Sequence, residues 1–133
     1  MDKKYILLVE DDAFLAELYA AKFSELGYEI ATAQDGKEGL RAIEKRHPDV
    51  VLLDIVLPKM DGLSVLKEIK SNEALKAIPV ILLTNLGQKE DVERGLALGA
   101  DAYIIKAHFT PTELVAKVEE VLQKGNYEFT NSQ

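Results

Sequence analysis

The sequence predicts one α/β domain in which five strands of a parallel sheet alternate with five helices. Three observations lead to this prediction: short apolar runs recur along the chain, helical apolar spacing fills the intervals, and turn residues separate the two patterns. Such alternation is typical of a parallel sheet with helices on both faces and right-handed crossovers. The length of 133 residues fits a single domain, which we expect over residues 1–124, followed by a short polar tail at 125–133 that should fray.

The strands are predicted from continuous apolar runs rich in β-branched and aromatic residues. Runs of this kind, rather than alternating ones, are typical of parallel strands that are covered on both faces. The four clear runs are Tyr5–Val9, Val50–Leu53, Val80–Leu83 and Tyr103–Ile105. A weaker candidate, Tyr28–Ala33, is expected to be an edge strand.

The helices are predicted from their end signals and from apolar residues at helical spacing. Asp35 with Glu38 has the form of a capping box, and the helix that follows should end before Pro48. Thr110 should cap the last helix, with Pro111 at its first position and Glu113 returning to the cap. The first helix should have its apolar face at Leu15, Leu18, Phe23 and Leu26, before a C-cap at Gly27. The third helix should have it at Leu63, Leu66 and Ile69, and the fourth at Val92, Leu96 and Gly99. The apolar face of the last helix should be Leu114, Val118, Val121 and Leu122.

Composition and charge exclude several kinds of function. The chain has no cysteine, so disulfides, thiolate metal sites and thiol catalysis are excluded, and His47 and His108 should lie on the surface or in loops. We find no signal peptide and no membrane-spanning run, which predicts a cytoplasmic protein without membrane contact. The net charge of −7 argues against direct contact with nucleic acid.

The side chains that can carry chemistry follow the predicted strands. They are Glu10, Asp11 and Asp12 after the first strand, Asp54 after the third, Thr84 and Asn85 after the fourth, and Lys106 after the fifth. The carboxyl ends of parallel strands share one edge of the sheet, where α/β proteins bind ligands. Taken singly, each residue has an ordinary interpretation as a cap, turn or loop residue, and Asp12 is expected to cap the first helix. The combination predicts a site.

Crowded carboxylates with no nearby sulfur or imidazole favour a hard cation bound through oxygen, and Mg²⁺ fits this description. A carboxylate beside such a metal can act as a nucleophile and form an aspartyl phosphate. Thr84 and Lys106 would then bind the oxygens of the transferred group, where negative charge lies.

Three segments resemble the receiver domain of two-component response regulators. They are ILLVEDD at 6–12, LDIVLPKMDG at 53–62 and LGADAYIIK at 98–106. The resemblance extends from about Lys4 to Lys124 and implies the flavodoxin-like and CheY-like strand order 2-1-3-4-5. It also implies a response regulator, stand-alone as far as this sequence goes, that signals through a downstream protein target.

The resemblance assigns roles around the phosphoacceptor. Asp54 would accept the phosphoryl group from a sensor histidine kinase or a histidine phosphotransfer protein. Mg²⁺ would be held by Asp11, by Glu10 through water, by Asp54 and by the main-chain carbonyl of Val56. Lys106 would pair with the acyl phosphate. The protein would catalyse only its own phosphorylation and dephosphorylation, and would not be a turnover enzyme.

The resemblance also implies a switch. Thr84 would hydrogen-bond the phosphoryl group and move inward, and Tyr103 would change rotamer to report that movement to the face formed by the fourth helix, fifth strand and fifth helix. Alternatively, Tyr103 is an aromatic strand residue that packs half in the core and has no switching role. Arg94, Asp101 and Lys117 suit a phosphorylation-dependent dimer through that face, and a solvated face on a monomer is the other interpretation.

Four positions depart from the family pattern. Ala107 stands where a proline after a cis bond is usual, so either the bond is trans with Lys106 aimed differently, or packing holds a strained bond. Asn85 stands where a very small residue is usual, and it would narrow the entrance or donate to the phosphate. Val56 and Leu86 flank the path of a hydrolytic water and cannot orient it, which predicts slow autodephosphorylation.

Three other functions were weighed. A haloacid dehalogenase-type phosphatase needs an aspartate where Val56 stands, and it needs room for a cap domain. A flavodoxin-like electron carrier needs a phosphate loop where Glu10, Asp11 and Asp12 would repel the flavin phosphate. A degenerate receiver that only binds proteins stays open because of Asn85 and Ala107.

Overall fold

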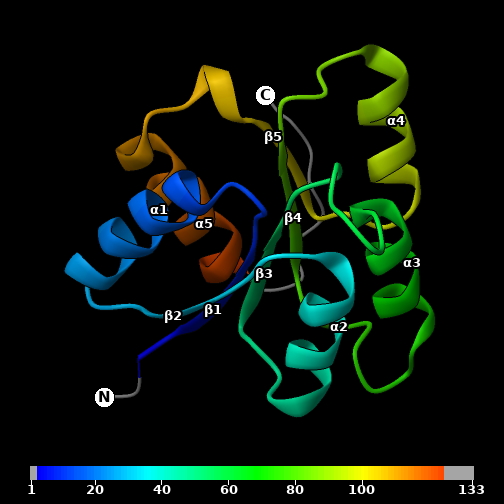
Figure 1. The fold of residues 1–133 in the computed structure, drawn as a ribbon, viewed down its shortest axis with the longest axis horizontal. Coiled ribbons are helices and arrows are strands. Elements are labelled where there is room, and N and C mark those ends of the chain that lie inside the picture. The colour runs from blue at the N-terminus through cyan, green and yellow to red at the C-terminus, as the bar shows by residue number, and fades with distance from the viewer. Residues whose placement is uncertain (1–2, 125–133) are drawn as a thin grey trace.

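The computed structural model describes residues 3–124 and shows a five-stranded parallel sheet in the order β2-β1-β3-β4-β5 (Figure 1). The predicted fold class and strand order are therefore confirmed, while the predicted tail at 125–133 lies outside the described residues. The strands are β1 Tyr5–Val9, β2 Glu29–Ala33, β3 Val50–Leu53, β4 Val80–Thr84 and β5 Ala102–Ile105. The helices are α1 Ala13–Glu25, α2 Gly36–Lys45, α3 Gly62–Ser71, α4 Lys89–Ala97, α5 Pro111–Lys124 and the short 3₁₀ helix η1 Lys106–His108.

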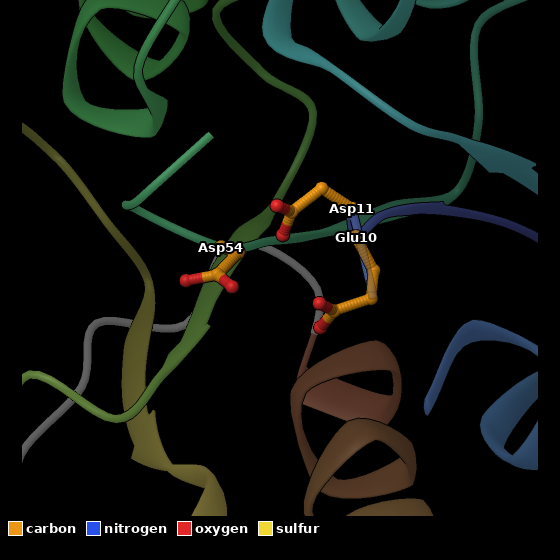
Figure 2. A group of neighbouring side chains, drawn as sticks. All are labelled: Glu10, Asp11 and Asp54. Carbon is orange, nitrogen blue, oxygen red and sulfur yellow. The ribbon is translucent and has the colours of Figure 1, made fainter. Parts of the chain in front are cut away.

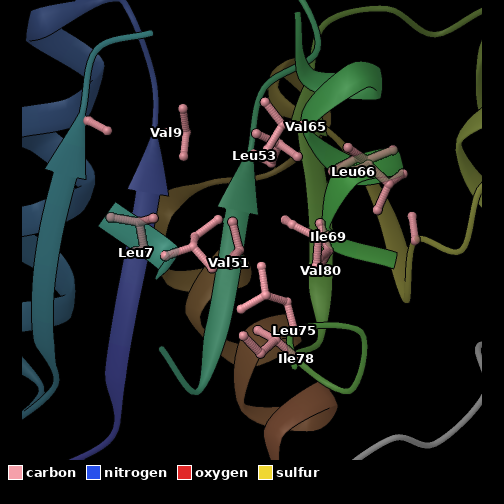
Figure 3. Close-up of a cluster of buried hydrophobic side chains, with 14 of the residues drawn as sticks. Leu7, Val9, Val51, Leu53, Val65, Leu66, Ile69, Leu75, Ile78 and Val80 are labelled. Carbon is pink, nitrogen blue, oxygen red and sulfur yellow. The ribbon is translucent and has the colours of Figure 1, made fainter. Parts of the chain in front are cut away.

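The sheet separates two apolar layers because successive strand residues point to opposite faces. Leu7, Val51 and Leu53 pack toward α2 and α3, in the cluster that Figure 3 shows. Ile6, Leu8 and their neighbours pack toward α1 and α5 on the other face. Both sets are apolar, which explains why the runs are continuous rather than alternating. Figure 1 shows α1 and α5 on one side of the sheet and α2, α3 and α4 on the other.

The strand predictions agree with the structure to within a residue at each end. β2 lies at one edge, as expected, and only its last residue, Ala33, is fully buried. The central strands β1, β3 and β4 are buried along their whole length. Whether a strand is buried on both faces thus depends on whether it lies in the centre or at the edge of the sheet.

The predicted caps form at α1 and α5, and the predicted capping box at α2 forms only in part. Asp12 caps α1 by accepting from the amide of Leu15, and the last helix has a complete capping box in which Thr110 and Glu113 each accept from the other's amide. At α2 the cap residue Asp35 accepts from the Glu38 amide, but the Glu38 carboxylate accepts from Gln34, one residue before the cap. No helix within the described residues is long and apolar enough to cross a bilayer.

The predicted apolar face of α1 is partly wrong. Tyr19 and Phe23 are its buried residues, whereas Leu18 and Leu26 are exposed. Tyr19 and Phe23 lie about one turn apart and face the sheet together, while Leu18 is rotated from Tyr19 by about 100°. Leu26 is the C-cap, where the chain leaves the helix toward Gly27 at φ 94°.

Candidate phosphoryl-transfer site

The strand register brings the predicted site residues to one edge of the sheet. Val9 of β1 pairs with Leu53 of β3, so Glu10 and Asp54 follow paired positions. On the other side, Thr84 of β4 pairs with Ile105 of β5, the residue before Lys106. Figure 2 shows the carboxylates of Glu10, Asp11 and Asp54 extending toward a common space from the ends of β1 and β3.

Asp54 is held on both of its carboxylate oxygens. Only 7% of the residue is exposed, and its amide donates to Val9 of the neighbouring strand. Oδ1 accepts a hydrogen bond from the Ile55 amide at 2.7 Å, and Oδ2 accepts one from Nζ of Lys106, also at 2.7 Å. Each oxygen has a second lone pair, so an Asp54 oxygen can attack another atom while it keeps its hydrogen-bond partner.

Lys106 joins two buried carboxylates. Its Nζ lies 2.7 Å from Oε1 of Glu10 as well as 2.7 Å from Oδ2 of Asp54. Burial on its own would lower the pKa of Lys106, but the hydrogen bonds to Asp54 and Glu10 outweigh it, so the pKa is raised. The residue is therefore an ammonium at neutral pH.

Glu10 is the most deeply buried acid of the site, with 1% of its surface exposed. Burial raises the pKa of Glu10, and the hydrogen bonds from Lys106 and from the Asp12 amide offset this rise only in part. The Asp12 amide donates to Oε2 at 3.1 Å, and the Lys106 ammonium lies beside Oε1. A cation at this position would favour the charged form further.

The acidic group fits a divalent cation. One oxygen from each of Glu10, Asp11 and Asp54 lies within 4.8 Å of the others. Oxygens on opposite sides of one Mg²⁺ lie about 4.2 Å apart, and this ion commonly keeps several waters, so Glu10 can act through a water. When ionised, the three carboxylates together with the Lys106 ammonium leave two negative charges, which a divalent ion balances. The Val56 carbonyl stays a predicted ligand.

The loop between β3 and α3 is fixed by two close backbone approaches. A Cβ on Gly62 would lie 1.9 Å from the carbonyl oxygen of Asp54, and a Cβ on Gly36 would lie 1.7 Å from that of Met60. The Gly36 amide also donates to the Pro58 carbonyl at 3.3 Å. The N-terminus of α2 thus supports the loop that carries Val56. Gly62 lies in one of the segments that resemble the receiver family, whereas nothing local in the sequence indicates Gly36, because its contact is to a distant segment.

Thr84 and Tyr103 are linked through one loop residue. Thr84 is buried, and its Oγ1 accepts from the Leu86 amide at 3.4 Å. The Tyr103 hydroxyl donates to the Leu86 carbonyl at 2.5 Å, while its ring packs toward α4, where a Cβ on Gly95 would come within 3.2 Å. Burial raises the pKa of Tyr103 to about 12, with Asp91 and Asp54 adding to the effect. Leu86 is therefore the common partner of both predicted switch residues.

The Lys106–Ala107 bond is trans, since the described residues contain no cis peptide. The expectation that a trans bond would aim Lys106 differently is wrong, because Nζ reaches Asp54. The chain turns after Lys106 into η1, and the Ala107 amide donates to Oδ1 of Asn85 at 3.1 Å. Asn85 and Ala107, which both depart from the family pattern, are thus in contact.

Exposed apolar side chains lie on helix α1 and on the β3–α3 loop. Phe14 is 73% exposed in the first turn of α1, and Leu18 is exposed one turn later. Val56, in the loop after Asp54, is 62% exposed. Apolar spacing predicts Leu18 on the buried face and gives no signal for Phe14, since spacing does not reveal which residues face solvent.

Asp101, one of the three charged residues that suit a dimer contact, forms its hydrogen bonds within the domain. Asp101 accepts from the Val80 amide at 2.8 Å and from Nζ of Lys70 at 3.4 Å. Lys117 forms an ion pair with Glu120 on the same helix. The charge pattern Arg94–Asp101–Lys117 therefore gives no support for a dimer.

A doubly wound α/β fold with an acidic, lysine-containing site at the carboxyl edge of its sheet defines a class of phosphate- and metal-handling proteins. The family model of the response regulator receiver domain matches residues 6–119, and the chain belongs to this family. The chain is thus a receiver domain of the two-component type, as the sequence resemblance implied.

Curated relatives and solved structures agree with the family. The chain is 41% identical over 124 residues to "Probable transcriptional regulator ycf27" of Guillardia theta, covering 93% of this chain and 47% of the relative. It is 37% identical to the regulator PhoP of Bacillus subtilis, covering 94% of this chain and 50% of the relative. A CheY-like receiver domain protein from Methanospirillum hungatei superposes with a TM-score of 0.86 at 31% identity, covering 93% and 97% of the two chains.

A further neighbour is CheY in the CheX-CheY-BeF3-Mg+2 complex from Borrelia burgdorferi, with a TM-score of 0.82, 30% identity and coverage of 89% and 88% of the two chains. The chain spans about half the length of the curated relatives it matches. Because these relatives are named as transcriptional regulators, the expectation of no nucleic-acid partner gains no support from them.

Proposed function

We propose that the chain accepts a phosphoryl group on Asp54 from a phosphohistidine donor, with Mg²⁺ bound among Glu10, Asp11 and Asp54. The single observation that carries the proposal is the position of Lys106, whose ammonium bridges the buried carboxylates of Asp54 and Glu10. An ammonium and a group of acids at the carboxyl edge of the sheet provide both the nucleophile and the positive charge that phosphoryl transfer needs.

The reaction is a displacement at phosphorus. A carboxylate oxygen of Asp54 forms a bond to phosphorus while the bond from phosphorus to the donor histidine nitrogen breaks, and the imidazole leaves with that electron pair. Lys106 and Thr84 would contact the oxygens of the transferred group, and bound Mg²⁺ would neutralise part of its charge. The products are an aspartyl phosphate and a free histidine on the donor, so the chain changes only its own phosphorylation state.

The switch follows from the contacts of Leu86. If the Thr84 hydroxyl turns to the phosphoryl group, it gives up the Leu86 amide. The Leu86 carbonyl is held by the Tyr103 hydroxyl, so movement of this loop is passed to β5 and α4. We propose that this face carries the signal to a downstream protein.

The donor partner is proposed from the exposed apolar side chains. Phe14 and Leu18 lie on α1, which begins immediately after the acidic run, and Val56 lies two residues after Asp54. An apolar surface beside the acidic site suits a histidine kinase or a phosphotransfer protein that presents its histidine on a helix. We therefore propose that the exchange takes place in the cytoplasm.

A second arrangement is favoured by the length of the relatives. They are named as transcriptional regulators and are about twice as long as this chain, so in a longer protein this receiver would regulate transcription through the remaining segment. Direct contact of residues 1–133 with nucleic acid is not proposed, because the net charge is −7.

The proposal is tested with a small phosphodonor such as acetyl phosphate and the intact mass of the protein. The wild type and Asp12→Asn should each gain one phosphoryl group in Mg²⁺, since Asn also caps helices and residue 12 is not the acceptor. Asp54→Asn and the wild type in EDTA should gain none. Absence of a gain in the wild type would support a degenerate receiver instead, and a gain that survives Asp54→Asn would assign the chemistry elsewhere.

A further inference from the structure

Two loops at the site edge are joined by a hydrogen bond between a side chain and a main-chain amide. Oδ1 of Asn85 accepts from the Ala107 N–H at 3.1 Å. Asn85 directly follows Thr84 at the end of β4, and Ala107 directly follows Lys106 at the end of β5. The bond therefore lies one residue beyond each of two proposed site residues.

The loop that carries Lys106 makes few hydrogen bonds to its surroundings, although Phe109 packs against the core. After Ile105 the chain leaves the sheet and forms the single turn η1, closed by a hydrogen bond from the Phe109 amide to the Lys106 carbonyl at 3.2 Å. In the described part of the chain, the Asn85–Ala107 contact is the one hydrogen bond that joins the main chain of 106–110 to the β4–α4 loop. Without this bond, Ile105 would still be held beside Thr84 by strand pairing, but the chain after Lys106 would lose its hydrogen bond to the β4–α4 loop.

The bond depends on the chemistry of both partners. The alanine at 107 supplies an amide hydrogen that a proline would lack, and the asparagine at 85 supplies an acceptor that a small aliphatic residue would lack. Lys106 holds its two carboxylates with a long side chain of freely rotating bonds, so its reach depends on where the main chain starts. Fixing the Ala107 amide fixes that starting point.

We infer that Asn85 is a positioning residue, which holds the Lys106 loop against the Thr84 loop so that the ammonium stays on Asp54 and Glu10. The expected effect on phosphorylation rests on the proposed function, whereas the effect of Asn85 on the position of Lys106 does not. One solvent-exposed hydrogen bond changes an equilibrium by about three- to tenfold, and effects of that size are expected here.

The structural content is tested by NMR in the full chain. Asn85→Ala should speed hydrogen exchange of the Ala107 amide about tenfold and should move the Cε resonance of Lys106, in lysine-labelled protein, toward that of exposed lysines. Asn85→Asp keeps an acceptor oxygen and should restore both signals. Gln88→Ala is the matched control, because Gln88 is an amide of the same loop whose side chain makes no cap hydrogen bond. Unchanged Ala107 and Lys106 signals in Asn85→Ala would overturn the inference.

The catalytic consequence is tested with acetyl phosphate and Mg²⁺. Asn85→Ala should lower the maximal phosphorylation rate, measured at saturating Mg²⁺, about three- to tenfold, while Gln88→Ala should match the wild type. An Asn85→Ala rate equal to that of Gln88→Ala would overturn the positioning role. A wild type that is not phosphorylated would contradict the proposed function alone, since the two NMR signals still decide whether Asn85 positions Lys106.

Discussion

Nζ of Lys106 lies 2.7 Å from Oδ2 of Asp54, although the two residues are 52 positions apart in the chain. The ammonium also contacts Glu10 at 2.7 Å, so one ammonium pairs with two buried acids. The pairing of each of these three charged side chains therefore depends on the other two.

Removing the ammonium should destabilise the metal-free protein. In Lys106→Met, Asp54 and Glu10 would lose their shared cation, and breaking a buried pair in this way costs about 3 kcal/mol. Urea unfolding in EDTA measures the loss, and Mg²⁺ should recover part of it because a divalent ion can pair with the same carboxylates. Lys76→Met removes an exposed lysine that pairs with Glu73 and should cost less than about 1 kcal/mol. Equal losses in the two variants would contradict the central position of Lys106.

A methyl group on Gly36 should disturb the metal site from a distance. The Cβ of Gly36→Ala would lie 1.7 Å from the Met60 carbonyl, so the β3–α3 loop must shift, at a cost of about 2–3 kcal/mol in the free energy of unfolding. Mg²⁺ affinity, measured by calorimetry, should fall with it because the same loop carries Val56. Gly27→Ala is the control: its φ is 94° and the space around it is open, so it should cost about 1–2 kcal/mol and leave Mg²⁺ affinity unchanged. A Gly36→Ala protein with wild-type Mg²⁺ affinity would argue against the loop contact.

Two tyrosines should ionise late. Burial raises the pKa of Tyr103 to about 12, and burial together with the hydrogen bond to Glu119 raises the pKa of Tyr28 to about 12, from an ordinary value of 10. Between pH 10 and about 12 the unfolded chain has lost protons that the folded chain keeps, so stability should fall as pH rises through this window. Absorbance at alkaline pH follows the ionisation, and Tyr103→Phe and Tyr28→Phe should each remove one late-titrating group. A complete tyrosine titration near pH 10 in the folded protein would contradict this prediction.

The aspartyl phosphate should be long-lived. Val56 stands two residues after Asp54 and Leu86 two residues after Thr84, and neither apolar side chain can orient an attacking water. Val56→Asn with Leu86→Lys supplies polar groups at both positions, and one well-placed hydrogen bond should speed decay of the phosphorylated protein about fivefold. Phosphate release after removal of the phosphodonor gives the rate. An unchanged decay rate in the double variant would show that these two positions do not set the lifetime.

The sequence predicted the strands, their order and the site residues because the information is local or follows from topology. Each central strand is an apolar run that ends at a polar residue, as β3 ends before Asp54, and a parallel sheet brings such ends to one edge. The capping box of Thr110 and Glu113 was readable for the same reason, since both partners lie within one turn. Residue types at these positions were enough to indicate the chemistry.

Contacts that depend on the path of a loop or on a side-chain direction were not predictable in the same way. The pairing of Lys106 with Glu10, the contact of Gly36 with Met60 and the bond from Ala107 to Asn85 each join segments that are distant in the chain. Leu18 was placed on the wrong face because Leu18 and Tyr19 both offer apolar surface about 100° apart on the helix, and sequence spacing does not tell which of them faces the sheet. These details came only from the folded arrangement.

The most direct test of the central claim is to locate the phosphoryl group on the chain. After reaction with acetyl phosphate and Mg²⁺, borohydride reduces an aspartyl phosphate to homoserine, which peptide mass spectrometry assigns to a single position. The account predicts homoserine at Asp54, with Glu10, Asp11 and Asp12 unmodified. Reduction at any of those three acids, or a phosphoryl group that resists borohydride and maps to a serine, threonine or histidine, would contradict it.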